Sequence, residues 1–109
     1  MNYYDRQIET ADREQLRQVQ LARLQKQVRF TYENVPHYKQ KLDNAGFHPD
    51  DLQTLEDIRH IPFSTKADMR ENYPYGLFAV PMKRIVRIHA SSGTTGKPTV
   101  VGYTREDLD

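Results

Sequence analysis

Residues 84–103 run Arg84-Ile-Val-Arg-Ile-His-Ala90, then Ser91-Ser-Gly-Thr-Thr-Gly-Lys97, then Pro98-Thr-Val-Val-Gly-Tyr103. The first and third segments are rich in β-branched residues, which predicts two strands. The middle segment is a Ser/Gly/Thr-rich loop that joins them and ends in a lysine. Because two strands alone are marginally stable, we expect them to be the first strands of a larger mixed sheet.

The loop between the predicted strands has the residue types that suit a phosphate group. Gly93 and Gly96 permit positive φ and let backbone N–H groups approach a ligand closely. The serines and threonines add hydroxyl donors, and Lys97 adds a mobile positive charge. Successive N–H groups in such a turn form a concave anion-binding site. From the loop chemistry alone, both a phosphate cradle and a plain connecting loop remain open.

The loop does not match the Walker A motif of P-loop nucleoside triphosphatases. That motif has a glycine five residues before its second glycine, where this chain has Ser91. It also has Ser or Thr after the lysine and a helix beyond it. Here Pro98 follows Lys97 and a strand comes next, so the standard P-loop enzyme is excluded.

The first 35 residues are predicted to form a long amphipathic helix. Its apolar stripe recurs every three or four positions from Leu21 through Leu24, Val28 and Tyr32 to Val35, and Leu16 and Val19 extend it. Asp12 and Gln15 have capping-box spacing and would start the helix. We favour a helix packed through one stripe over a coiled coil, because the stripe is too short for three or four heptads.

Shorter elements follow this helix. Pro36 suits the first position of a second helix, and Gly46 suits its C-terminal end. Residues 61–63, Ile-Pro-Phe, predict an extended step, since a residue before proline avoids the helical region. Thr65 and Asp68 then have capping-box spacing for a third helix.

Composition excludes several classes of protein. The 16 basic and 15 acidic residues leave a formal charge of +1, which argues against a dedicated nucleic-acid or anionic-membrane binder. The chain has no cysteine, so disulfides, thiolate metal sites and a cysteine nucleophile are excluded. The four histidines lack metal-ligand spacing, and we predict no metal site. No stretch approaches the roughly 20 apolar residues of a membrane span, so we expect a cytoplasmic protein.

The loop and its flanks resemble the adenylate-forming, AMP-binding superfamily, and within it the phenylacetate-CoA ligases. The string SSGTTGKPTVVGYT over residues 91–104 carries this resemblance, which covers nearly the whole chain from about Leu16. Further matching segments are Tyr32-Glu-Asn-Val-Pro-His-Tyr38, Asp57-Ile58 leading to Ile61-Pro62-Phe63, and Thr65-Lys-Ala-Asp-Met-Arg70. A bare GTTGKP loop would indicate only the superfamily, whereas these flanks select the branch.

The resemblance implies an α/β fold that is truncated. We expect a mainly helical region over residues 1–82, and over 83–109 the start of the AMP-binding domain as strand, phosphate loop and strand. It implies that the β,γ-phosphates of ATP are held by Ser91, Ser92, Gly93, Thr94, Thr95, Gly96 and Lys97. Lys97 would be catalytic, neutralising charge as pyrophosphate leaves. Lys66 is a second candidate phosphate contact, against the alternative of a solvated surface lysine.

The implied reaction converts phenylacetate or a related aryl acid to its CoA thioester through an acyl-adenylate. Its co-substrates and cofactor are ATP, coenzyme A and Mg²⁺. The expected partners are these small molecules and the remainder of the same polypeptide, and a homodimer stays open. We expect no turnover from the 109-residue chain alone, because later superfamily elements lie outside it. A stand-alone phosphate-binding module and a helical interaction domain are the alternatives.

Overall fold

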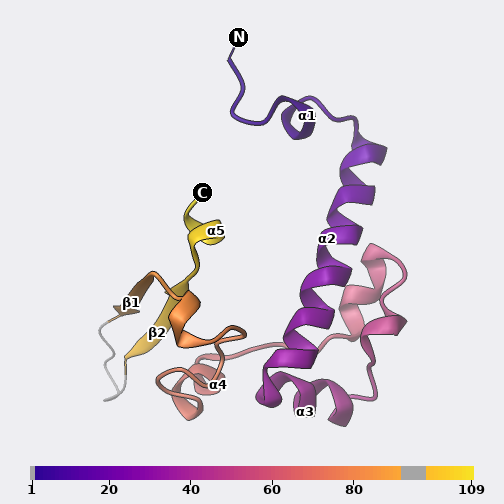
Figure 1. The fold of residues 1–109 in the computed structure, drawn as a ribbon. Coiled ribbons are helices and arrows are strands. Elements are labelled where there is room, and N and C mark those ends of the chain that lie inside the picture. The colour runs from indigo at the N-terminus through magenta and orange to yellow at the C-terminus, as the bar shows by residue number, and fades with distance from the viewer. Residues whose placement is uncertain (1, 92–97) are drawn as a thin grey trace.

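The computed structural model describes residues 2–91 and 98–109 of the chain. Its N-terminal part is helical (Figure 1). The elements in this part are α1 (Arg6–Glu9), α2 (Arg13–Asn34), α3 (Pro36–Asn44) and the 3₁₀ helices η1 (Pro49–Asp51) and η2 (Leu55–His60). The long helix α2 runs the length of this part, and α3 turns back across the C-terminal end of α2 (Figure 1).

Helix α2 begins where the capping box predicts. The Asp12 carboxylate accepts a hydrogen bond from the backbone N–H of Gln15 at 2.8 Å, and the Gln15 side chain accepts one from the Asp12 N–H. These reciprocal bonds satisfy two donors that a helix start leaves unpaired. The prediction of one helix over the first 35 residues is wrong. Helix α1 ends at Glu9, and a separate helix, α2, begins at Arg13.

The end of α3 explains the placement of its glycine. Gly46 has a φ of +71°, which glycine adopts at little steric cost. Its N–H donates to the carbonyl of Asp43, and the N–H of Phe47 donates to the carbonyl of Leu42. This pair of bonds is the Schellman motif, and it brings the buried side chains of Leu42 and Phe47 together. The predicted start at Pro36 and end before Gly46 are confirmed.

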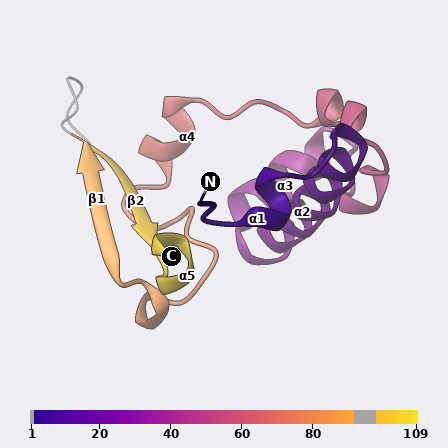
Figure 2. The same ribbon diagram turned by 90° about the horizontal axis from the view of Figure 1, so that it is seen from above.

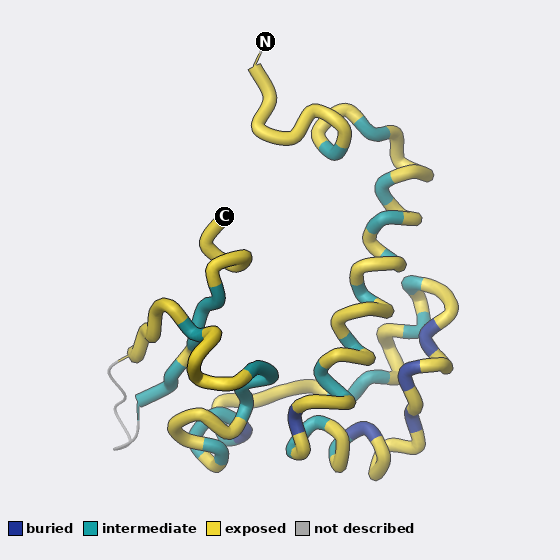
Figure 3. Tube along the Cα trace, viewed as in Figure 1, coloured by how far each residue is buried: buried dark blue, intermediate teal, exposed yellow. Residues whose placement is uncertain are grey.

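The buried core lies between α2, α3 and the following turns (Figure 3). Leu42, Phe47 and Leu52 form its centre, and Leu52 is only 1% exposed. Half-buried side chains packed against them are Leu24, Val28, Tyr32 and Ile61. Three of these belong to the predicted stripe of α2, so this stripe faces the core as expected from its spacing.

The C-terminal part contains α4 (Lys66–Glu71), η3 (Met82–Arg84), a β-hairpin and α5 (Arg105–Leu108). Strands β1 (Arg87–Ser91) and β2 (Thr99–Tyr103) pair antiparallel, with Arg87 opposite Tyr103 and Ser91 opposite Thr99. Both predicted strands are confirmed, although β1 starts three residues later than Arg84 because η3 occupies that position. Every residue of β1 is exposed, as expected of an uncovered strand.

Helix α4 lies between the helical part and the hairpin in both ribbon views (Figure 2). It contacts β2, and its own capping box joins Thr65 to Asp68 as predicted. Residues 61–65 connect α4 to the helical part as an extended segment. This helix is therefore one element through which the two parts are connected.

Candidate functional site

The phosphate-loop prediction falls largely on residues that lie outside the described part of the chain. Ser92, Gly93, Thr94, Thr95, Gly96 and Lys97 belong to this segment, and their assigned roles stay predictions. The structure describes both ends of the loop. Ser91 is the last residue of β1, and Thr99 is the first residue of β2 and lies opposite it.

The two strand ends are joined by side chains as well as by the backbone ladder. The hydroxyls of Ser91 and Thr99 form a hydrogen bond across the hairpin. A hydroxyl can donate one hydrogen bond and accept others, so this bond does not use the full capacity of Ser91. Ser91 is thus placed where β1 enters the loop, and its role as a phosphate contact stays a prediction.

The hairpin is supported from one side by the segment that precedes it. A Cβ added to Gly102 would lie 2.7 Å from the Phe78 ring and 3.3 Å from Ile85 Cδ1. On β1, the ring of His89 contacts the ring of Tyr103 edge-on, with centroids 5.1 Å apart. His89 therefore has a partner within the hairpin itself.

Lys66 is the first residue of α4 and is exposed. Thr65 caps this helix, and its N–H donates to Oδ2 of Asp68 at 2.7 Å. Helix α4 has six residues, which is too short to be stable in isolation. The location of Lys66 consequently depends on what holds α4 against the rest of the protein.

A buried carboxylate provides that attachment. Asp68 is 7% exposed and accepts hydrogen bonds from His37 Nε2 and Lys41 Nζ, both at 2.8 Å. Both donors lie on α3. The hydrogen bond from Lys41, then that from the Thr65 N–H, hold the pKa of Asp68 well below its usual range. Desolvation opposes this shift and is outweighed, so the carboxylate is ionised at neutral pH.

Sequence reasoning identified Asp68 only as a capping partner and missed its donors. His37 and Lys41 precede it by 31 and 27 residues, and no local spacing rule connects them. The one available signal was the spacing of His37 and Lys41, which are one helical turn apart and share a face of a predicted helix.

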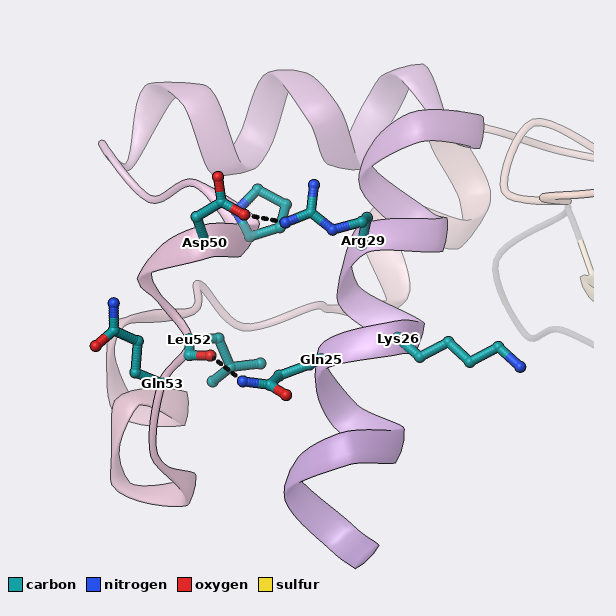
Figure 4. Close-up of a pocket in the computed structure, with 7 residues that line it drawn as sticks. Gln25, Lys26, Arg29, Asp50, Leu52 and Gln53 are labelled. Carbon is teal, nitrogen blue, oxygen red and sulfur yellow. Dashed lines mark hydrogen bonds and ion pairs between the residues drawn. The ribbon is translucent and has the colours of Figure 1, made fainter. Parts of the chain in front are cut away.

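A pocket of about 310 Å³ lies between α2 and the segment formed by η1 and the two residues after it (Figure 4). It is lined by Gln25, Lys26, Arg29, Pro49, Asp50, Leu52 and Gln53. Arg29 pairs with Asp50, and Gln25 Nε2 donates to the Leu52 carbonyl at 2.8 Å. Ser91 and Lys66, the two predicted phosphate-binding residues that the structure describes, do not line this pocket. Its polar contacts connect α2 to η1 and to Leu52, the residue that follows it.

A second pocket, of about 270 Å³, is mostly apolar. It lies between α2, α3 and the extended segment, and it includes Val28, Leu42 and Ile61. Within residues 2–91 and 98–109, no cluster of three or more histidine, aspartate or glutamate side chains is suited to a metal ion. In the same residues, no helix combines the length and apolarity needed to cross a lipid bilayer.

Comparison with known proteins shows which enzymes the chain is similar to. The chain is 58% identical over 102 residues to phenylacetate-coenzyme A ligases from Aromatoleum evansii and from Escherichia coli strain K12. It is 54% identical over 105 residues to the ligase of the same name from Thermus thermophilus. The chain is thus similar in sequence to one part of the phenylacetate-CoA ligases. It spans 23% of the length of the first two ligases and 24% of the third.

The fold agrees with this relationship. A crystal structure of 2-hydroxyisobutyryl-CoA ligase with 2-HIB-AMP and CoA, in the thioesterification state, matches 96% of the chain with a TM-score of 0.88 and 36% identity. The same ligase in its postadenylation state with 2-HIB-AMP matches with a TM-score of 0.84 and 32% identity. The chain covers 23% of each structure. No protein-family model matches the chain. The fold is thus that of an adenylate-forming CoA ligase segment, as predicted.

Proposed function

We propose that this chain forms part of a ligase that activates phenylacetate, or a related aryl acid, to its CoA thioester. The observation that carries the proposal is the identity of 54–58% to phenylacetate-CoA ligases over at least 94% of the chain. Because the chain spans about a quarter of those enzymes, the rest of the catalytic apparatus would come from further polypeptide. Residues 83–109 would begin its AMP-binding domain.

The reaction has two steps. First, a carboxylate oxygen of the acid forms a bond to the α-phosphorus of ATP, and the bond to the β-phosphate oxygen breaks, releasing pyrophosphate. Second, the thiol of CoA, losing its proton, attacks the acyl carbon, and AMP leaves with the bonding electrons. The protein contributes mainly by positioning these groups and stabilising the charge that develops.

Within this scheme, residues 91–97 hold the β,γ-phosphates and Lys97 neutralises the charge of departing pyrophosphate. The hairpin supports this role because its register and the bond between Ser91 and Thr99 bring the two ends of the loop together. Lys66 is the second phosphate contact. Mg²⁺ would enter with ATP, and residues 2–91 and 98–109 contain no cluster of three or more histidine, aspartate or glutamate side chains suited to bind it. The use of ATP and CoA supports a cytoplasmic location for the enzyme.

A chimaera tests the proposal. The segment of the Escherichia coli ligase that aligns with this chain would be replaced by the 102 matching residues of this chain. We expect the folded chimaera to release AMP in a reaction that requires phenylacetate and CoA. Lys97→Ala and Lys66→Ala should then raise its apparent KM for ATP. The proposal is wrong if folded chimaeras built from the Escherichia coli ligase and from the Thermus thermophilus ligase are both inactive.

A stand-alone phosphate-binding module is the competing function. Titration of the 109-residue chain with ATP, followed by NMR, separates the two. Specific shifts confined to residues 91–97 together with an inactive chimaera would favour the module. We expect no turnover from the isolated chain, so CoA- and acid-dependent AMP release from it would contradict the need for further polypeptide.

A further inference from the structure

We propose that His37 and Lys41 are positioning residues. They act through the Asp68 carboxylate to hold the helical turn that carries Lys66 in the position from which Lys66 contacts the phosphates of ATP. This inference rests on the proposed function and assigns to α3 a part in ATP binding. None of the three residues needs to touch the nucleotide.

The Asp68 carboxylate has donors on both oxygens from two separate helical elements. Oδ1 accepts from His37 Nε2 at 2.8 Å; an ionised carboxylate can only accept, so this ring nitrogen carries the proton. Oδ2 accepts from Lys41 Nζ at 2.8 Å and from the Thr65 N–H at 2.7 Å. One buried group therefore joins two turns of α3 to the start of α4, and charge-assisted bonds of this length are strong.

A second contact fixes the other side of the same turn. The hydroxyls of Tyr38 and Ser64 lie 2.8 Å apart and form a hydrogen bond. Ser64 and Asp68 thus flank Lys66, and both are bound to α3. Helix α4 also contacts β2, the strand that leaves the loop at residues 92–97. Helix α4, which carries Lys66, is therefore attached to α3 on one side and to the hairpin on the other.

Lys66 does not share the Asp68 carboxylate, so its ammonium group is available to a ligand. Lys66 and Asp68 are two residues apart on α4, and side chains at this spacing do not face each other. The charge of Asp68 is instead engaged by Lys41 from the neighbouring helix. The exposed Lys66 side chain can therefore reach a phosphate while its backbone stays anchored. Small displacements of such a group are costly, since a misplacement of about 1 Å can lower a rate roughly 100-fold.

The test uses the chimaeric ligase with Lys41→Met, which removes the donor but keeps most of the aliphatic stem, and separately with His37→Gln. We expect each variant to raise the apparent KM for ATP roughly 3- to 30-fold, the range typical of coupled neighbours. The KM values for phenylacetate and CoA should not change. Lys41→Arg, which keeps the charge and a donor, should restore most of the ATP affinity.

A double-mutant cycle decides whether Lys41 acts through Lys66. In the Lys66→Ala background, Lys41→Met should cause no further rise in the KM for ATP, because the residue it positions is gone. Lys39→Met is the matched control; Lys39 lies on the same helix, is exposed and pairs with Asp43 at 3.3 Å. It should leave all KM values unchanged. Circular dichroism and the melting temperature show whether each variant is folded. If the Lys41→Met chimaera does not fold, Lys41→Gln is used in its place.

The outcomes separate the inference from the function beneath it. An inactive chimaera overturns the proposed ligase function. An active chimaera in which Lys41→Met and Lys66→Ala have additive effects overturns the positioning role alone. The same holds if the melting temperature falls while the KM for ATP stays constant, or if Lys66→Ala has no effect.

Discussion

The ring of Phe78 lies directly against the backbone of Gly102 in strand β2. An added methyl group at residue 102 would stand 2.7 Å from both Cε2 and Cζ of that ring, closer than real Cβ contacts allow. Phe78 belongs to the segment between α4 and η3, so this contact ties that segment to the hairpin. The glycine is required here for close approach rather than for its backbone angle.

Gly102→Ala should therefore destabilise the hairpin by overpacking, at a cost of about 1–3 kcal/mol. The measurement is the free energy of unfolding of the protein that contains this segment. Phe78→Leu in the same protein should recover part of the loss, because a smaller side chain leaves room for the methyl group. Equal losses with and without the Phe78 change would show that the ring is not the cause.

Gly46→Ala makes a contrasting prediction. No atom lies within 4 Å of an added Cβ at this residue, but its φ of +71° strains any side chain. The expected cost is about 1–2 kcal/mol from backbone strain alone. Gly46→Asn should cost less, because asparagine tolerates the left-handed region better. An asparagine as costly as alanine would contradict this explanation.

Leu52→Ala should lower the free energy of unfolding by about 2–5 kcal/mol, since it empties space at the centre of the core. Leu52 is 1% exposed and packs with Leu42 and Phe47. Ile58→Ala is the control, because Ile58 is 53% exposed and loses little burial. Similar losses for the two variants would place the core elsewhere.

Asp68→Asn should make stability less sensitive to acid. The pKa of Asp68 is lowered in the folded protein, first by Lys41 and then by the Thr65 N–H. A lowered folded pKa means that this stabilisation is complete above the unfolded pKa, about 3.9, and is lost as the pH falls towards the folded pKa. The melting temperature of the unmodified protein should thus fall more between about pH 5 and pH 2 than that of the variant. Lys41→Met should reduce the acid sensitivity in the same direction. Parallel pH curves would show that the carboxylate is not held ionised by these donors.

Thr99→Val should loosen the mouth of the phosphate loop. It removes the hydroxyl that bonds to Ser91 while keeping a β-branched side chain that suits a strand. In the active chimaera we expect the KM for ATP to rise about two- to tenfold, the loss of one ordinary hydrogen bond. Thr99→Ser, which keeps the hydroxyl, should behave like the parent. An unchanged KM in Thr99→Val would mean that this bond does not organise the loop.

The sequence by itself determined the local structure of this protein. Capping boxes at Asp12 and Thr65, the proline at the start of α3 and the glycine at its end all act through atoms within four residues of each other. The two strands followed from β-branched runs on either side of a glycine-rich loop. Such short-range rules need no knowledge of distant residues, and the match to phenylacetate-CoA ligases is likewise carried by linear strings of residues.

Only the tertiary structure decided which distant side chains meet. The attachment of Asp68 to His37 and Lys41 joins positions about 30 residues apart, and the contact of Phe78 with Gly102 spans 24 residues. Neither pairing has a periodicity or a motif, because each depends on how α4 and the hairpin come to lie beside the helical part. The physical reason is that a buried carboxylate is stable only where the fold places hydrogen-bond donors beside it. Likewise, an aromatic ring can approach the backbone this closely only at glycine, which has no Cβ.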